Sequence, residues 1–529
     1  MSKRRGYIGI AALLTIMVIA DISLAQKQGG ILRVFHRDSP ASMSILEEGS
    51  ISAIMPMMGV FNNLVLFDQH KPQNRVETIV PELATSWSWS EDGTELSFKL
   101  REGVRWHDGK PFTSADVKCT YDLLTGKAKE KLRLNYREAW FSNIDKVSTS
   151  GDSEVTFHLK RPQPALISLL ASGYSPVYPC HIPAREMRSH PIGTGPFKFV
   201  EYKPGQSIKV ARNPDYWKPG RPYLDGIEYT IIASRSTAIL AFAAGKFDMT
   251  FPYEVSIPLV KDVRRQDPRA ICKVMPMNGR ANLLIIDAPP FNNPVLRRAM
   301  QLSLDRKSFI DILGEGQYDI GAVLQPPPEG IWGMPKEMLQ QLTGYGPDVQ
   351  KNREQARSMM RSLGYGPDNR LKVKLSTRNI AWYRDPAAIL IDQLKEIWID
   401  AELDTVETAN WVPKLMRKDF TVAMSLSGSA VDDPDNQFYE NYSCRSSRNY
   451  TGCNPALDSL IGKQSAESDP KKRKELVWQI ERKLIEDAVR PIIFFMRQGT
   501  CWQPEVKNLT LMENSIFNSW RMEDVWLDK

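Results

Sequence analysis

Alternating apolar and polar residues predict half-buried β-strands in the first third of the chain. In ELSFKL (residues 95–100) and EVTFHL (residues 154–159), every second residue is apolar. Near the start, ILRVFH (residues 31–36) is strand-like in the same way. Side chains two apart share one face of a strand, so we expect each segment to place one face on a core.

A helix is predicted between the strands at 95–100 and 154–159. Asp108-Gly109 indicates a turn, and Thr113 or Ser114 can cap the helical stretch SADVKCTYDLL.

From about residue 294 the pattern changes to long amphipathic helices. Pro294 suits the first turn of one helix, Gly364 suits a left-handed stop, and Asp469 and Pro491 bracket a last helix. The predicted helical segments are NPVLRRAMQLSLDRKSFIDIL, DVQKNREQARSMMRSLGYG, DPAAILIDQLKEIWI and DPKKRKELVWQIERKLIEDAVRP. Strand-like pieces such as LKVKLST and FTVAMSL lie between them. Mixed strands early and alternating helix and strand late predict two α/β lobes.

Residues 1–25 differ from the rest of the 529-residue chain. Three basic residues at positions 3–5 precede a short apolar run, and small residues follow up to Ala25. This pattern is typical of a secretory signal peptide cut after Ala25. The alternative is an uncleaved anchor, but the run is short against the roughly 20 residues of a membrane span. No cysteine follows the cut site, so we expect a periplasmic protein without a lipid anchor; the export route stays open.

Charge excludes one class of partner. The formal net charge is +7, and removing the leader takes away three positive charges and one negative charge, which leaves +5. The basic residues are spread out, and no cluster of them alternates with aromatic residues. We therefore expect no nucleic-acid partner.

Six cysteines remain, and an oxidising compartment permits disulfides. Cys444 and Cys453 are close in sequence with a turn-like segment between them, so they are a candidate pair, although sequence alone cannot establish connectivity. Cys119, on the predicted helix, is interpreted as a small buried hydrophobic residue. The state of Cys180, Cys272 and Cys501 is left open.

No catalytic or metal motif is found. The six histidines include no pair at the HExxH spacing, no Cys/His quartet has zinc spacing, and GxSxG and Walker motifs are absent. His107-Asp108 falls on a predicted hairpin tip, where a solvated or structural role is favoured. The segment DDPDN lacks the glycine and distal glutamate of a calcium loop. The sequence therefore predicts no enzyme activity, no metal and no cofactor.

A series of longer motifs is more informative. VRWHDGKPFTSADV resembles the signature of the family 5 solute-binding proteins, which serve ABC importers of peptides, nickel and related solutes. GTGPFKFVEYKPG, PPFNNPVLRRAMQLSLDR and SSRNYTGCNPALDSLI match further blocks in the same order. The resemblance implies a two-lobed α/β periplasmic binding protein of the class II type, with two crossover strands and an extra subdomain. Hinge closure would bury a solute between the lobes.

The same resemblance implies a division of the chain. Lobe I is expected at residues 26–65, 190–275 and 491–529, the extra subdomain at 66–189, and lobe II at 276–490.

The segment GSAVDDPDN (residues 428–436) carries the expected binding site. In dipeptide-binding relatives the position matching Ala430 is an aspartate that binds the peptide's α-ammonium group, so that anchor is missing here. Asp432 could supply a displaced anchor or be solvated. Asp433 is kept as a candidate contact, but it and Asp435 match the DPDN of those relatives, and a turn is expected at Asp433-Pro434 because the residue before proline is restricted.

Other candidate contacts come from the same resemblance or from general pocket chemistry. Trp411 matches a pocket-lining tryptophan, with a core role as the alternative, and Gly428 and Ser429 match backbone contacts. An arginine can fork onto a carboxylate, which makes Arg378 and Arg384 candidates, with surface placement as the alternative. Met57 and Phe61 are candidates on the lobe I side, although core packing is favoured for both.

The leading hypothesis is a monomeric receptor that delivers a peptide or another polar organic molecule to an ABC permease and its ATPase. Alternatives are a receptor for an opine, an oligosaccharide or a metal chelate, and a solute sensor or chaperone that never docks to a permease.

Overall fold

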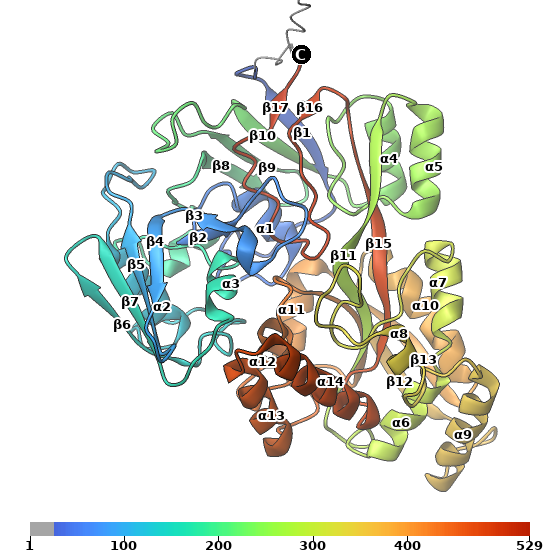
Figure 1. Cartoon of the computed structure of the whole chain (residues 1–529). Coiled ribbons are helices and arrows are strands. Elements are labelled where there is room, and N and C mark those ends of the chain that lie inside the picture. Colours follow the sequence, from blue (N-terminus) through green and yellow to red (C-terminus); the bar gives the residue numbers. More distant parts are fainter. Residues whose placement is uncertain (1–25) are drawn as a thin grey trace, which may run out of the picture.

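The computed structural model describes residues 26–529, so the predicted signal peptide lies outside the described residues. Two bodies of mixed helix and strand are joined by a pair of long strands (Figure 1). One body contains a four-stranded sheet of order β1-β10-β9-β8, and the other a five-stranded sheet of order β13-β12-β14-β11-β15. A third, four-stranded sheet stands to one side. The predicted α/β class with two lobes is confirmed.

In the first body, β1 pairs in parallel with β10, and β9 pairs antiparallel with β10 and β8. Apolar residues of these strands, including Leu32, Val34 and Ile208, belong to the buried hydrophobic core. The strands are β1 Ile31–His36, β8 Phe197–Lys203, β9 Ser207–Arg212 and β10 Gly226–Ile231, with a small pair β2 Val65–Phe67 and β3 Ile79–Pro81. The helices are α1 Ile51–Met57, α4 Arg235–Ala243 and α5 Ile257–Gln266.

The third sheet is antiparallel throughout, with order β4-β5-β7-β6. Its strands are β4 Ala84–Trp89, β5 Glu95–Leu100, β6 Ile144–Ser150 and β7 Glu154–Leu159, and its helices are α2 Ser114–Leu124 and α3 Leu166–Ala171. Helix α2 begins where the sequence predicted, because Thr113 and Asp116 form a reciprocal capping box. His107 has a structural role, since its Nε2 lies 3.0 Å from the carbonyl oxygen of Gly195.

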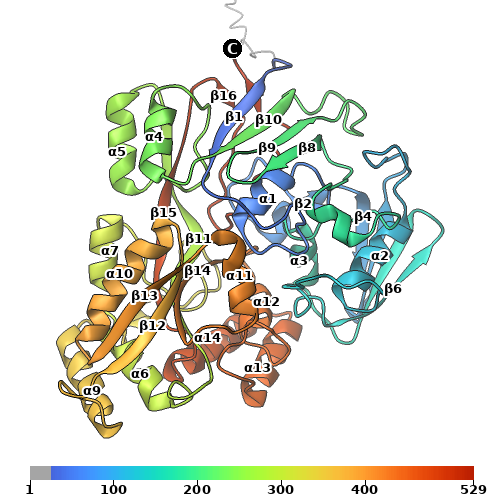
Figure 2. The same ribbon diagram turned by 180° about the vertical axis from the view of Figure 1, so that it is seen from behind.

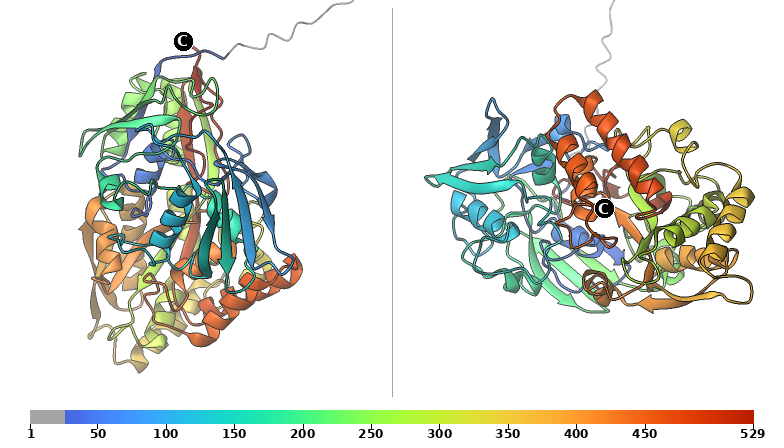
Figure 3. Two further views of the ribbon diagram at one scale, coloured as in Figure 1. Left: turned by 90° about the vertical axis from the view of Figure 1, so that its left-hand side faces the viewer. Right: turned by 90° about the horizontal axis from the view of Figure 1, so that it is seen from below.

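Helices cover both faces of the five-stranded sheet, and α12 to α14 extend towards the third sheet (Figures 2 and 3). The strands are β11 Ile271–Ile285, β12 Leu371–Arg378, β13 Ile399–Val406, β14 Val422–Gly428 and β15 Ile492–Trp502. The helices are α6 Pro294–Ser303, α7 Arg306–Gly314, α8 Lys336–Leu339, α9 Val349–Ser362, α10 Ala381–Lys395, α11 Thr408–Met416, α12 Pro434–Asn441, α13 Pro455–Ala466 and α14 Pro470–Glu486.

One predicted helix is in fact two. The periodic segment that starts at Pro294 breaks after Ser303, and α7 starts at Arg306. The Asp305 carboxylate accepts a hydrogen bond from the backbone N–H of Ser308 at 3.1 Å. This is an N-cap, which favours a new helix start at that point. The apolar spacing continues across the break and therefore concealed it.

Strands β11 and β15 connect the two bodies. They run antiparallel, from the pair Ile271–Trp502 near one end to the pair Asn282–Ile492 near the other. The register shifts between Pro276 and Arg280, where β11 carries extra residues as a bulge. Asn278 adopts φ 50° within the bulge, a conformation that asparagine tolerates better than most residues.

All six cysteines form disulfides. Cys444 is bonded to Cys453, and Cys272 to Cys501, which links β11 to β15. Cys119 is bonded to Cys180, so the prediction that Cys119 is an unpaired hydrophobic residue is wrong. Cys119 and Cys180 are 61 residues apart, and Cys272 and Cys501 are 229 apart, so sequence proximity could not reveal these two bonds.

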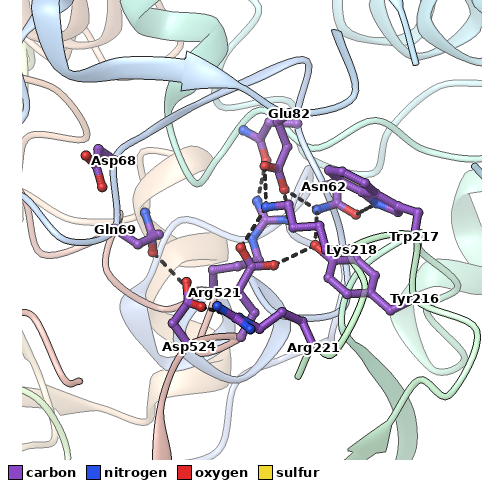
Figure 4. A network of polar contacts seen from close by, with 12 residues as sticks. Asn62, Asp68, Gln69, Glu82, Tyr216, Trp217, Lys218, Arg221, Arg521 and Asp524 are labelled. Atoms are coloured by element: carbon purple, nitrogen blue, oxygen red, sulfur yellow. Dashed lines mark hydrogen bonds and ion pairs between the residues drawn. The ribbon is translucent and has the colours of Figure 1, made fainter. Parts of the chain in front are cut away.

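The C-terminal segment is held to the first body by a buried polar network (Figure 4). The Arg521 guanidinium lies 3.3 Å from Glu82, and both side chains are almost completely buried. Lys218 bridges the carboxylates of Glu82 and Glu523 at 2.8 and 2.6 Å. The two cations and two carboxylates compensate one another. No helix among residues 26–529 is both long and apolar enough to cross a lipid bilayer.

We expect Arg521→Met to destabilise the protein by about 3 kcal/mol, because it leaves buried Glu82 with only part of its positive partners. Urea unfolding followed by tryptophan fluorescence measures this. The matched control is Arg221→Ala, which removes the more exposed ion pair with Asp524 from the same network and should cost less than about 1 kcal/mol. Equal losses in the two variants would contradict this account of the network.

Candidate functional site

A cavity lies where the two bodies meet the third sheet and the C-terminal segment. About 80 Å³ of it is accessible to the centre of a water molecule. A single buried water needs about 10–15 Å³ by the same measure, so the space accommodates a small guest. The first body contributes Arg37 and Ser50, the region of the third sheet contributes Arg137 and Tyr174, and the C-terminal segment contributes Phe517.

The carboxyl ends of two strands form the opposite wall. Arg378 is the last residue of β12 and Gly428 the last of β14, and these strands pair in parallel. Ligands of open α/β sheets bind outside the carboxyl ends of such strands. The bulge in β11 completes the wall with Met277 and Gly279. The site is therefore continuous with the strands that connect the two bodies.

Aromatic side chains line two sides. Trp382 and Tyr383 come from the first turn of α10, and Tyr174 lies 4.8 Å from Phe517 between ring centres. Trp411 does not line the cavity; it packs edge-on against Tyr383, with 6.1 Å between ring centres. These rings can hold the apolar part of a guest.

The polar wall is dominated by arginine. Four arginines line the cavity but only one carboxylate, Glu440, does so. Arg448 is bonded to Glu440, and Arg378 is bonded to Asp38 behind the wall. Arg37 lies 3.4 Å from Glu254. Burial raises the pKa of Glu254 to about 7 despite this arginine.

Direct bonds hold the two bodies together across the cavity. Asp38, which follows β1, accepts hydrogen bonds from Arg378 and from the hydroxyl of Thr408 at 2.9 Å. Burial alone would raise the pKa of Asp38, but the Arg378 and Arg37 guanidiniums lower it well below its ordinary value. On the other side of the cavity, the Gln163 amide donates to Asp435 at 2.9 Å. The structure is therefore closed around the cavity.

The structure brings three of the sequence-predicted contacts together on the cavity wall, namely Arg378, Gly428 and Ala430. Ser429 lies beside them but is buried, and its backbone N–H donates to Asn278 at 3.1 Å. The role of each in binding stays a prediction.

The aspartates of the DDPDN segment point away from the cavity. Asp433 caps α12 and forms a bidentate ion pair with Arg473 at 2.7 and 2.8 Å. Asp432 accepts a hydrogen bond from the backbone N–H of Ile331 at 3.1 Å. Neither residue lines the cavity, so the arrangement does not place Asp432 where a displaced ammonium anchor is needed.

Three other candidates also lie outside the cavity wall. Met57 and Phe61 are buried in the core, and Phe61 stacks on Tyr178 with 5.1 Å between ring centres. Arg384 is exposed and donates to Asn379. Sequence reasoning missed Arg37, Arg137 and Arg448, because no local pattern distinguishes them from the other arginines of the chain. Among residues 26–529, no group of His, Cys, Asp and Glu side chains is arranged to hold a metal ion.

The chain is similar to a known protein family and to several characterised relatives. The family model described as bacterial extracellular solute-binding proteins, family 5 Middle, matches residues 78–449. The probable di/tripeptide-binding protein 5 of Pseudomonas aeruginosa (strain UCBPP-PA14) is 24% identical over 506 residues, which cover 89% of this chain and 92% of the relative. The oligopeptide-binding protein AppA of Bacillus subtilis (strain 168) is 26% identical over 443 residues, covering 78% and 77%.

Solved structures show the same fold. The Helicobacter pylori DppA structure with the peptide STSA has a TM-score of 0.83 at 21% identity, covering 95% of this chain and 99% of that chain. The AgaA structure from A. tumefaciens R10, in complex with agropinic acid, has a TM-score of 0.80 at 22% identity, covering 94% and 99%.

We expect Asp38→Asn to weaken closure, because it removes the charge that compensates buried Arg378. Small-angle scattering of the unliganded variant should show a larger radius of gyration than the parent protein. The matched control is Asp385→Asn, which removes the more exposed Arg235–Asp385 pair between the same two bodies and should change the radius little. An unchanged radius for Asp38→Asn would show that this contact does not hold the closed form.

The raised pKa of Asp432 should make the stability of the protein depend on pH. Withdrawal from water raises the pKa of Asp432 to about 7, although hydrogen bonds from Ile331 and Asn514 and the charge of Arg75 oppose the rise. Asp433 adds to it. The folded state therefore binds more protons than the unfolded state between about pH 4 and 7, so this residue's contribution to stability falls as pH rises through that window.

Asp432→Asn should match the parent near pH 4 and become the more stable protein by about 1–2 kcal/mol above pH 7. Urea unfolding at a series of pH values measures the difference. Asp368→Asn, at an exposed position, serves as the control and should show no such trend. A constant difference at all pH values would rule out titration of Asp432 as the cause.

Proposed function

Because the chain belongs to the family 5 bacterial extracellular solute-binding proteins, we propose that it is the periplasmic substrate-binding component of an ABC transporter. It captures a small solute, a peptide or another polar organic molecule, between two lobes. The observation that carries this proposal is the cavity between the lobes, whose walls come from both bodies and from the strands that connect them. The family membership predicted from the sequence is confirmed.

The names of the relatives support a peptide or peptide-like ligand. Two relatives are named for di/tripeptides and oligopeptides, and one structural neighbour holds an opine-type acid, agropinic acid. An opine or similar non-peptide ligand is therefore the second candidate. The permease and ATPase of the importer are the proposed partners, and we propose that the protein acts as a monomer.

We propose the same division into lobes that the sequence predicted. Lobe I comprises residues 26–65, 190–275 and 491–529, lobe II residues 276–490, and the subdomain residues 66–189. Binding alone, without a chemical step, is consistent with relatives that are named as binding proteins. A sensor or chaperone that docks to no permease would share the cavity, and co-purification with the permease distinguishes the two.

A thermal-shift screen against peptides, opines, oligosaccharides and nickel chelates tests the function. A ligand at a hundred times its dissociation constant adds about 2.7 kcal/mol of apparent stability. Its addition should also reduce the radius of gyration in scattering, because it shifts the equilibrium between open and closed lobes further towards the closed form. Leu426→Trp, which fills the cavity from its wall, should abolish the shift. Leu403→Trp, at an exposed position, should keep it. Ligand shifts that survive Leu426→Trp would place binding elsewhere.

A further inference from the structure

Arg137 is the cavity arginine that lacks a counter-charge. Among residues 26–529, no carboxylate lies within 4.0 Å of its guanidinium, whereas Arg37, Arg378 and Arg448 each have at least one. The Arg137 side chain is buried, and its Nη1 donates only to the carbonyl oxygens of Ile45 and Glu48, at 3.4 and 3.0 Å. Its Nε is buried with no partner.

The carboxylate and the arginine nearest to Arg137 on the wall are already paired with each other. Glu440, the only carboxylate on the wall, is already bonded to Arg448 and accepts a hydrogen bond from Asn436 at 3.1 Å. Deeper in lobe II, Arg280 and Arg490 are buried beside neutral amide groups instead of acids. Burial lowers the pKa of the Arg137 guanidinium, and the more distant charge of Glu440 offsets this only in part.

An uncompensated buried cation destabilises a protein by several kcal/mol. A guest carboxylate removes that penalty and can form two parallel hydrogen bonds with a guanidinium. The ring of Tyr174, whose centre lies 3.5 Å from the guanidinium carbon, keeps the guanidinium plane in position. Arg137 is therefore prepared for an anion that the protein itself does not supply.

A free ammonium group, by contrast, finds no vacant carboxylate on this wall. Glu440 is occupied, and position 430, at the centre of the lobe II wall, is an alanine. The charges behind the wall, Asp38 and Glu254, are engaged by Arg378 and Arg37.

We propose that the guest is a small organic anion with a carboxylate bound to Arg137 and without a free α-ammonium group. This inference rests on the binding role proposed above and specifies the chemical class of its ligand. The aromatic residues Trp382, Tyr383 and Phe517 would hold the less polar part of the same molecule.

A library of matched pairs tests the proposal. Each of the twenty Gly-X dipeptides is paired with its malonyl-X acid, in which a carboxylate replaces the ammonium group on the same CH2. Thermal shift selects binders, and titration calorimetry measures their dissociation constants. We expect the tightest binder to be a malonyl acid, with a dissociation constant at least about tenfold below that of its dipeptide. The proposal is overturned if dipeptides bind more tightly or if no acid binds.

Variants then assign the effect to Arg137. Arg137→Gln should raise the dissociation constant of the selected acid by about 30-fold or more. The dissociation constant of its dipeptide should change little. Arg137→Lys keeps the charge without the fork and should recover part of the affinity. The matched control is Arg445→Gln, which changes an exposed arginine near Arg448 and should leave both ligands unaffected. Because both ligands carry the carboxylate of X, equal weakening of acid and dipeptide would show that Arg137 does not bind the malonyl carboxylate, which contradicts the proposal.

A second variant keeps the test independent of how well Arg137 substitutions fold. Ala430→Asp adds a carboxylate to the cavity wall and should shift the preference from the acid towards its dipeptide. An unchanged preference would contradict the charge argument. If dipeptides bind and close the lobes, the ligand class is wrong while the receptor function stands; if no solute binds or compacts the protein, both fail.

Discussion

The antiparallel pairing of β11 with β15 is the constraint on which the rest of the molecule depends. These two strands belong to the sheet of lobe II and continue into lobe I, where Cys272 and Cys501 join them covalently. Backbone hydrogen bonds at both ends leave the bulge at residues 277–279 as the irregular stretch between them. The relative position of the two lobes is therefore decided over a few residues, and a change in their backbone angles moves every contact across the cavity.

The same bulge lines the cavity through Met277 and Gly279. In the proposed function, a guest would therefore touch the strands that join the lobes, and binding and closure would share residues rather than act at a distance from each other. Closure has an electrostatic cost, because it withdraws several arginines from water. Asp38, Glu254 and Glu440 offset part of that cost. Arg137 has no such carboxylate partner, so part of that cost is not offset. An anionic guest should therefore favour closure more than a neutral guest of the same size.

The aspartates of the acidic segment at 432–435 have a structural role, although their carboxylates suggested a binding role. Its aspartates are the most conspicuous carboxylates in the sequence, yet Asp433 and Asp435 are bonded to groups of lobe II and the subdomain rather than facing the cavity. Asp435 accepts hydrogen bonds from Gln163 in the subdomain and from Ser465 in α13, so it connects parts of the chain that are far apart in sequence. The segment positions the cavity wall by fixing α12, which carries Glu440.

The sequence by itself determined the local elements and the family. Strands at 31–36, 95–100 and 154–159 and the caps at Thr113 and Asp469 follow from side-chain spacing and local hydrogen bonding, which neighbouring residues decide. The family follows from the resemblance of several long motifs in the same order. It did not reveal the break at Asp305, the bond of Cys119 to Cys180, or three of the four arginines of the cavity, Arg37, Arg137 and Arg448. The N-cap at Asp305 is local, but the continuing apolar spacing concealed it. The disulfide and the cavity arginines were decided only by the tertiary structure, because they depend on residues brought together from distant segments. The charge of Arg137 is visible in the sequence, but its lack of a partner is a property of the folded surroundings alone.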